Sequence, residues 1–373
     1  MQDTSDRHPA LQSRSLGSLE LANRFVVAPM TRTSATPDGA PTEAMAAYYA
    51  EFAAGGFGLV ITEGIYPDAA YSQGYVNQPG LVTKEHVNGW RAVTARVHAE
   101  GGSIVAQLMH AGALSQGNRY RDETLAPSAV QPHGGMMPAY GGSGPWPMPR
   151  EATHDDIAEV IEGFAAAARN AVEAGFDGIE VHSANGYLLD QFVTAYTNLR
   201  SDGYGGPMAN RIRLTAEIVE RIAAEAPAGF IVGVRVSQTK VNDIVYRWSG
   251  GAEDVVVIAQ ALAKAGADYI HVASEGRSWF ETAQLEDGTT VTGLAREVSG
   301  LPVIANGGMH DGDQAARVLT EGHADFLAIG HVALSNPDLP QRLAAGDELV
   351  EFDSAMLRPD VTIASSIRWR QAG

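Results

Sequence analysis

The stretch "FAAAARNAVEAGFDGIEVHSA", residues 164–184, changes its hydrophobic pattern at a glycine. Up to Gly175 it has the alanine-rich, amphipathic composition of a helix, and the glycine marks the end of that helix. The run that follows is almost continuously apolar, as expected of a short strand that is covered on both faces. The stretch therefore predicts a helix followed by one strand of a parallel sheet.

The same alternation of amphipathic and apolar segments recurs along the whole chain. The apolar runs of strand length occupy residues 24–30, 58–64, 103–110, 178–184, 230–237, 268–274, 302–308 and 326–331. No glycine-rich G-x-G-x-x-G turn follows the first run, which argues against an open, doubly wound sheet. The pattern predicts an α/β fold in which residues 1–373 form a single (β/α)8 TIM barrel.

The segments that connect the predicted strands differ in length. Residues 111–153, after the third strand, form a long loop rich in Gly, Pro and Met. We expect this loop to act as a lid that caps the carboxyl end of the barrel. Side chains of the loop that we expect to shape a substrate pocket are Tyr120, Met137, Tyr140 and Trp146. The polar N-terminus, about residues 1–15, is expected to be flexible.

The composition limits the classes of partner and compartment. The chain has 373 residues, a formal net charge of -18 and no cysteine. The negative charge argues against nucleic acid and anionic membranes as partners. The absence of cysteine excludes disulfides and thiolate metal sites, and it fits a reducing compartment. With a polar start and no apolar run of membrane-spanning length, the sequence predicts a cytoplasmic protein.

Three polar residues stand where the fourth predicted strand ends. Taken alone, His182, Asn185 and Tyr187 also fit a structural histidine beside a turn. In a barrel, however, the carboxyl ends of the strands form the active-site face. His182 and Asn185 can both hydrogen-bond one substrate oxygen and stabilise negative charge on it, while Tyr187 can donate a proton. This set fits conjugate addition of hydride to the β-carbon with protonation at the α-carbon.

No side chain supplies a hydride, so this chemistry requires a cofactor. Without a dinucleotide-binding fold, the sequence favours flavin mononucleotide (FMN), held by Gln107, Arg235 and backbone groups. The glycines after the seventh and eighth strands predict a phosphate site. The residues at the ends of the predicted strands that together describe a site for a planar, partly anionic ligand are Pro29, Met30, Thr31, Gly64, Gln107, Arg235, Asn306, Gly307, Gly308, Gly330 and His331.

Several motifs, in a fixed order, extend over nearly the whole chain. They are "NRFVVAPMTR", "VITEG", "AQLMHAG", "EVHSANGYLLDQF", "NLRSDGYGGPMANRIR", "VGVRVS", "VIANGG" and "NPDLP". In these motifs the chain resembles the Old Yellow Enzyme family of flavin-dependent ene-reductases. The resemblance implies an FMN-containing barrel that passes hydride from NADPH or NADH to a small-molecule activated alkene, an α,β-unsaturated carbonyl or nitro compound.

The resemblance also implies roles for individual residues. Thr31 would hydrogen-bond the flavin O4, and Arg235 would lie near the flavin N1 and O2. His182 and Asn185 would bind the substrate oxygen, and Tyr187 would be the proton donor.

One position departs from the family pattern. The family has a glycine–arginine pair after the eighth strand, with the arginine on the FMN phosphate, whereas this chain has Gly330 and His331. Weaker phosphate binding, a stronger pH dependence, or help from another cation such as Arg277 are the alternatives at this position.

Two other functions remain open at the level of sequence. One is an FMN barrel with a different physiological reaction, oxidative or demethylating. The other is a metal-dependent barrel hydrolase or lyase with His110, His182 and His331 as ligands, although no carboxylate accompanies them in a familiar ligand spacing. We expect no metal. The sequence does not indicate the natural alkene, the preferred nicotinamide, the stereochemistry, or whether the protein is a monomer or a homo-oligomer.

Overall fold

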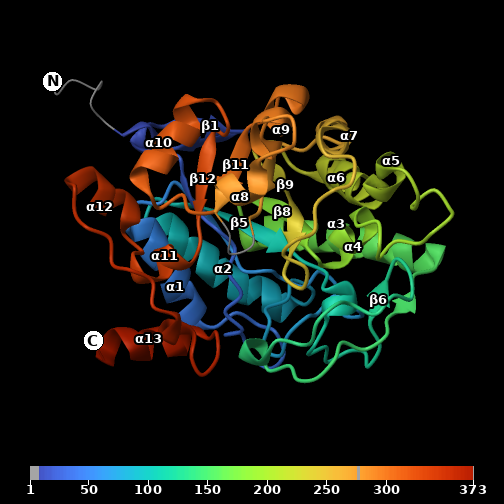
Figure 1. Ribbon diagram of the computed structural model, residues 1–373. Coiled ribbons are helices and arrows are strands. Elements are labelled where there is room, and N and C mark those ends of the chain that lie inside the picture. The colour runs from blue at the N-terminus through green and yellow to red at the C-terminus, as the bar shows by residue number, and fades with distance from the viewer. Residues whose placement is uncertain (1–7, 275–277, 373) are drawn as a thin grey trace.

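The computed structural model describes residues 8–274 and 278–372. Its centre is a closed barrel of parallel strands, which confirms the predicted (β/α)8 fold (Figure 1). The strands are β3 (Phe25–Val27), β4 (Leu59–Ile61), β5 (Ser103–Leu108), β8 (Gly178–Asn185), β9 (Ile231–Lys240), β10 (Tyr269–Val272), β11 (Val303–Asn306) and β12 (Phe326–Ile329). They pair in chain order, and β12 returns to β3 to close the barrel.

Helices surround the barrel, and their ends follow from local sequence signals. Helix α3 (His154–Ala174) begins with a capping box between Thr153 and Asp156 and ends at Gly175, whose φ is 83°. Its buried face is built from Phe164 and a row of alanines, which lets the helix lie close to the strands. The other helices are α1 (Glu43–Ala54), α2 (Lys84–Ala99), α4 (Leu188–Val193), α5 (Met208–Arg211), α6 (Arg213–Glu225), α7 (Ala252–Lys264), α8 (Trp279–Ala283), α9 (Val291–Ser299), α10 (Gly312–Thr320), α11 (His331–Ser335), α12 (Leu339–Ala345) and α13 (Ile363–Ala372). None of the described helices has the length and apolar composition needed to cross a membrane.

Two neighbouring strands extend further than the rest at the carboxyl end of the barrel. Strand β8 has 8 residues and β9 has 10, whereas β10, β11 and β12 have 4 each. The pairing of β8 with β9 is irregular between Ser183 and Asn185, and Asn185 lies opposite Lys240. Such an irregularity redirects side chains at the end of a strand. The active-site face therefore has its most extensive backbone support on this side.

The amino end of the barrel is closed by an antiparallel hairpin that the sequence analysis missed. Strands β1 (Arg14–Leu16) and β2 (Leu19–Leu21) pair with each other, and Leu16 and Leu21 pack among the side chains inside the barrel. A 3-10 turn, Pro9–Leu11, precedes them, and Ala10 and Leu11 are buried. Residues 8–15 are therefore folded against the barrel, and the expectation of a flexible segment is wrong for them.

The segment 111–153 forms the predicted insertion after the third barrel strand. Its two ends pair as short parallel strands, β6 (Leu125–Ala126) and β7 (Arg150–Glu151). The 3-10 turn Pro138–Tyr140 lies between them. In Figure 1 this segment lies at the bottom of the view, at the end of the barrel opposite β1.

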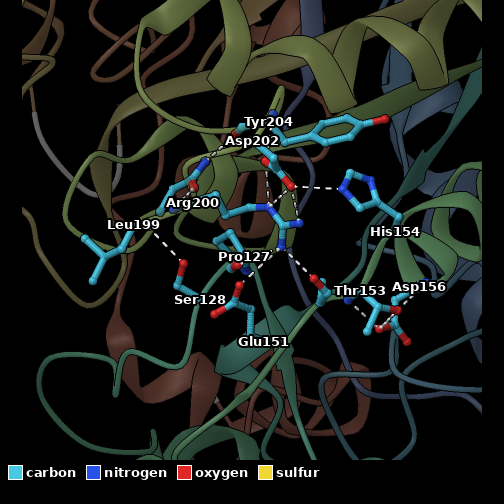
Figure 2. A network of polar contacts seen from close by, with 12 residues as sticks. Pro127, Ser128, Glu151, Thr153, His154, Asp156, Leu199, Arg200, Asp202 and Tyr204 are labelled. Atoms are coloured by element: carbon cyan, nitrogen blue, oxygen red, sulfur yellow. Dashed lines mark hydrogen bonds and ion pairs between the residues drawn. The ribbon is translucent and has the colours of Figure 1, made fainter.

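Arg200 joins both ends of this segment to the loop that follows α4. Its guanidinium donates to the carbonyl oxygens of Pro127 and Ala152, at 3.1 and 2.5 Å. It also forms an ion pair with Asp202 in which the closest N–O distance is 2.5 Å (Figure 2). Only 6% of the Arg200 side chain is exposed. The segment 111–153, called the capping segment below, is therefore anchored directly after β6 and directly after β7.

We predict that Arg200→Met loosens the capping segment while the barrel stays folded. The substitution removes the donor to two carbonyl groups and one of the partners of Asp202, which keeps the N–H of Tyr204. We expect a cost of about 2 kcal/mol, since Asp202 is also partly exposed. Denaturant unfolding and limited proteolysis, with cleavage sites mapped to 111–153, measure the two effects. The control Arg213→Met removes an exposed arginine that donates to the same loop, at Gly203, and should cost less than about 0.5 kcal/mol. Equal proteolysis of both variants would show that Arg200 does not anchor the segment.

Candidate active site

A cavity of about 560 Å³ opens at the carboxyl end of the barrel. Every residue that the sequence analysis assigned to catalysis or to the cofactor lines it, although their positions in the chain run from 29 to 331. These residues are Pro29, Met30, Thr31, Gly64, Gln107, His182, Asn185, Tyr187, Arg235, Asn306, Gly307, Gly308, Gly330 and His331. Tyr140 of the capping segment lines the cavity as well. The structure therefore brings the predicted set together in one place.

The last residues of β8 and the turn that follows carry the three residues proposed to act on the substrate. Asn185 has a φ of 65° and Gly186 a φ of 89°, so the chain reverses sharply before Tyr187. The rings of His182 and Tyr187 lie 5.3 Å apart. Within the described part of the chain, His182 Nδ1 and Asn185 Oδ1 are buried without a hydrogen-bond partner. Buried polar atoms of this kind are costly unless a ligand satisfies them, so they mark a binding site.

His182 is neutral in this environment. Burial lowers its pKa well below the usual value, and the neighbouring Arg235 and His271 lower it further. A neutral imidazole keeps one N–H group, which is the donor that a substrate oxygen needs. The proton of the reaction must then come from another group.

Tyr187 is in contact with a second tyrosine that the sequence analysis did not single out. The hydroxyl groups of Tyr75 and Tyr187 form a buried hydrogen bond. The ring of Tyr140 lies 4.8 Å from that of Tyr75. Tyr75 comes from the long loop between β4 and α2, a region without periodicity that could have indicated where its side chain points.

Gln107 is oriented by a carboxylate inside the barrel. It donates from Nε2 to Glu180 at 2.8 Å, and Glu180 also accepts from the hydroxyl of Tyr269 at 3.1 Å. His271 Nδ1 lies 2.9 Å from the same carboxylate. Although burial alone would raise it, the pKa of Glu180 is lowered by His271 and by Arg235. Glu180 is therefore an anion. In the sequence, it could have been found as the single acidic residue within the apolar run 178–184.

A second buried carboxylate holds the turn that contains Thr31. Glu63 Oε2 accepts from the backbone N–H groups of Arg32 and Thr33, at 2.9 and 3.1 Å. The hydroxyl of Tyr49 donates to Oε1 at 3.2 Å. Thr33 has a φ of 40°, which is unusual for a β-branched residue. The direction of Thr31 thus depends on Glu63.

The opposite side of the cavity is lined by glycines. Gly307 and Gly308 both have positive φ, 113° and 74°. A Cβ atom on Gly308 would lie 2.8 Å from Gln314 Nε2, so a larger residue would displace the end of that side chain and would also be strained by the positive φ. This part of the chain can bring backbone N–H groups close to a phosphate, as the sequence analysis expected.

His331 stands at the end of β12, where the family pattern has arginine. Its ring stacks on Phe352, with centroids 4.8 Å apart and planes at 17°. Burial lowers the pKa of His331, and the charge of Arg32 lowers it further. His331 therefore offers a neutral N–H group near neutral pH. Arg277, the other cation considered for the phosphate, lies outside the described residues.

The three histidines considered as metal ligands do not share one site. His110 is absent from the described lining of the cavity, and its Nδ1 accepts a hydrogen bond from Gly112 N at 3.1 Å. Within residues 8–274 and 278–372, no group of three or more His, Asp or Glu side chains is placed to hold a metal ion.

Of the four loop residues expected to shape the substrate pocket, only Tyr140 belongs to the described cavity lining. Met137 and Trp146 pack behind it, and the hydroxyl of Tyr120 is hydrogen-bonded to that of Tyr66.

The donor set fits FMN. The cavity offers glycine backbone on one side for a phosphate and Gln107 with Arg235 for a polar ring edge. The turn after β8 provides atoms for a second, oxygen-bearing ligand. A barrel with these features defines a cofactor-dependent oxidoreductase.

The comparison with known proteins identifies the family. The model of the NADH:flavin oxidoreductase / NADH oxidase family matches residues 14–349. A probable flavin mononucleotide-dependent alkene reductase of Leishmania infantum is 36% identical, over 91% of this chain and 91% of its own. The structure of an old yellow enzyme homologue from Zymomonas mobilis is 31% identical, with a TM-score of 0.83 over 94% of this chain and 96% of its own. Morphinone reductase in complex with tetrahydroNAD is 30% identical, with a TM-score of 0.79 over 93% of each chain. The chain therefore belongs to this family, that of Old Yellow Enzyme, and is a flavin oxidoreductase whose cofactor is FMN.

Glu63 gives the site a testable pH dependence. Burial raises its pKa from 4.5 to about 7. The pKa of Glu63 is thus higher in the folded protein than in the unfolded chain, so protonated Glu63 favours the folded state. Its contribution to the free energy of unfolding is complete below about pH 4.5 and is lost as the pH rises through 7. We predict that the free energy of unfolding of Glu63→Gln, relative to that of the wild type, increases by about 2 kcal/mol between pH 5 and pH 8.

Denaturant unfolding at several pH values, with constant excess FMN, measures this difference. The control Glu159→Gln changes an exposed carboxylate on α3 and should follow the wild type. Parallel curves for Glu63→Gln and the wild type would show that Glu63 does not titrate in this range.

Proposed function

We propose that this protein is an ene-reductase. It takes hydride from NADPH or NADH and reduces small-molecule activated alkenes, α,β-unsaturated carbonyl or nitro compounds. The observation that carries the proposal is the carboxyl end of β8, where His182, with an unpaired buried Nδ1, and Asn185 share one cavity with Tyr187. The names of its relatives, among them an alkene reductase, support it. The cysteine-free composition suggests action in the cytoplasm.

Bound FMN supplies the hydride that adds to the β-carbon of the alkene. His182 and Asn185 hydrogen-bond the carbonyl or nitro oxygen and stabilise the negative charge that builds up on it. Tyr187 donates its phenolic proton to the α-carbon, and the hydroxyl of Tyr75 contacts the oxygen that loses this proton. Thr31, Gln107, Arg235 and the glycines after β11 and β12 would hold the cofactor.

The direct test is anaerobic. The purified protein is reduced with NADPH or NADH, and reoxidation of the flavin is followed with a panel of enones, nitroalkenes and maleimides. Rapid reoxidation by these compounds supports the proposal. A flavin that the nicotinamides reduce but that no alkene of the panel reoxidises would contradict it.

Tyr187→Phe separates the two halves of the reaction. We predict that reoxidation by an enone slows by about 100-fold or more, because the proton donor is lost. Reduction by the nicotinamide, which needs no proton from Tyr187, should stay within about threefold of the wild type. Stopped-flow absorbance of the flavin measures both rates. The control Tyr120→Phe removes a hydroxyl in the capping segment, outside the described cavity lining, and equal losses in both half-reactions of Tyr187→Phe would contradict the role.

His331→Arg tests the phosphate end of the cavity. An arginine there adds a charge-assisted hydrogen bond to the phosphate, so we predict about tenfold tighter binding of FMN. Fluorescence titration of the apoprotein with FMN gives the dissociation constant. Riboflavin, which lacks the phosphate, should bind both proteins alike. The control His133→Arg places the same charge on the exposed surface of the capping segment. If it tightened FMN binding as much as His331→Arg does, the gain would come from long-range attraction of the phosphate and not from a contact at position 331.

A further inference from the structure

The turn 184–187 has a backbone that must be held in place. Asn185 and Gly186 are two successive residues with positive φ, 65° and 89°. Such a conformation persists in a residue with a side chain only when surrounding contacts fix it. Its polar backbone atoms are correspondingly paired: Asn185 N donates to Ser237 Oγ at 2.8 Å, and Gly186 O accepts from Gln191 Nε2 at 2.7 Å.

The N–H group of Gly186 is held by a carboxylate. It donates to Asp190 Oδ2 at 2.7 Å, from the first turn of α4. The other oxygen of Asp190 accepts from Lys240 Nζ, also at 2.7 Å. The Asp190 side chain is 0% exposed and that of Lys240 is 1% exposed. An ion pair that is removed from water in this way stands directly behind the turn.

Lys240 connects this pair to the neighbouring strand. It is the last residue of β9 and lies opposite Asn185 in the pairing with β8. Its Nζ also donates to the carbonyl of Ser237 at 3.2 Å, and it lies 4.9 Å from the centre of the Tyr246 ring. The ammonium group therefore joins the end of β9 to the carboxylate that holds Gly186.

The energetics point to geometry rather than stability as the role of the pair. Taking two charges out of water costs about as much as their attraction returns, and apolar residues of similar size often stabilise a protein as well. The best-supported role of a buried ion pair is to favour one conformation of the chain over others. Neither Asp190 nor Lys240 belongs to the described lining of the active-site cavity, although Lys240 lines a separate, much smaller cavity. Direct contact with a ligand in the active-site cavity therefore does not account for the pair.

We propose that Asp190 and Lys240 are positioning residues that fix the Gly186 amide and thereby aim Asn185 and Tyr187 into the cavity. The inference rests on the proposed function of that turn. The ammonium group keeps the carboxylate in place, and the carboxylate keeps the Gly186 N–H in place. Without this acceptor, the turn relaxes towards negative φ, and Asn185 and Tyr187 lose their common direction.

Two double variants test the idea without leaving a lone buried charge. In Asp190→Asn with Lys240→Met, the side-chain amide oxygen can still accept from Gly186. In Asp190→Leu with Lys240→Met, the volume is similar but the acceptor is gone. We expect the Leu variant to bind a substituted phenol about tenfold more weakly and to reoxidise with an enone about tenfold more slowly. The Asn variant should stay within about threefold of the wild type in both measurements.

Flavin absorbance gives the phenol dissociation constant, and stopped-flow absorbance gives the reoxidation rate. The FMN dissociation constant should stay within about twofold in both variants, because the cofactor residues come from other strands, except Arg235, which lies five residues before Lys240 on β9. A general loss of folding would instead weaken FMN binding as well. If the Leu variant folds, keeps its FMN affinity and binds the phenol as the Asn variant does, the positioning role is wrong. If the Leu variant loses FMN affinity in parallel with phenol affinity, the pair is structural and the proposal is also overturned.

A third variant separates this inference from the proposed function. His182→Ala with Asn185→Ala should weaken phenol binding by about tenfold or more, since both donors are lost. If it does so while the Leu variant is unaffected, only the positioning role fails. If phenol binding does not depend on His182 and Asn185, the oxygen-binding site itself is misassigned.

Discussion

The closure of the parallel barrel is the constraint on which the rest of the structure depends. Each strand is hydrogen-bonded to two neighbours that run in the same direction, and β12 pairs with β3 to complete the circle. All carboxyl ends therefore meet at one end of the barrel. Residues as distant in the chain as Pro29 and His331 line the same cavity for this reason. The closure also encloses whatever polar groups the strands direct inwards, and these must find partners inside the barrel.

The interior meets that requirement around one carboxylate. Glu180 accepts from Gln107 and Tyr269 and lies beside His271, so a charge within β8 becomes a fixed anchor for residues of two other strands, β5 and β10. Gln107 reaches from this interior group to the cavity, and its orientation is thus set before any ligand binds. The other side of the cavity is closed by a loop, which depends on contacts such as those of Arg200 for its position. The site therefore combines a rigid base with a separately anchored cover.

The parts of the structure that the sequence predicted are those governed by periodicity and by strand direction. Eight apolar runs indicated eight strands, and the polar residues at their ends indicated the site. The N-terminal hairpin was missed because strands of three residues, two of them not buried, carry too little pattern. Tyr75 and Phe352 were missed because they lie outside the runs, and the path of a long loop depends on tertiary contacts. Glu180 was visible as an acidic residue in an apolar run, but only the structure shows what surrounds it.

The two ends of the cavity are built by different strands. The residues that would determine the affinity for the cofactor phosphate are therefore separate from those that would act on the substrate. The turn after β8, with its supports Ser237 and Lys240 on β9, aims Asn185 and Tyr187. The glycines that face the phosphate follow β11 and β12, on the far side of the barrel from β5 and β8. A substitution at the phosphate end, such as the histidine at 331, can therefore change how tightly the cofactor is held without disturbing the turn. The departure from the family pattern at His331 is in this sense compatible with an intact reaction site, because His331 follows β12 and the turn follows β8, on the opposite side of the barrel.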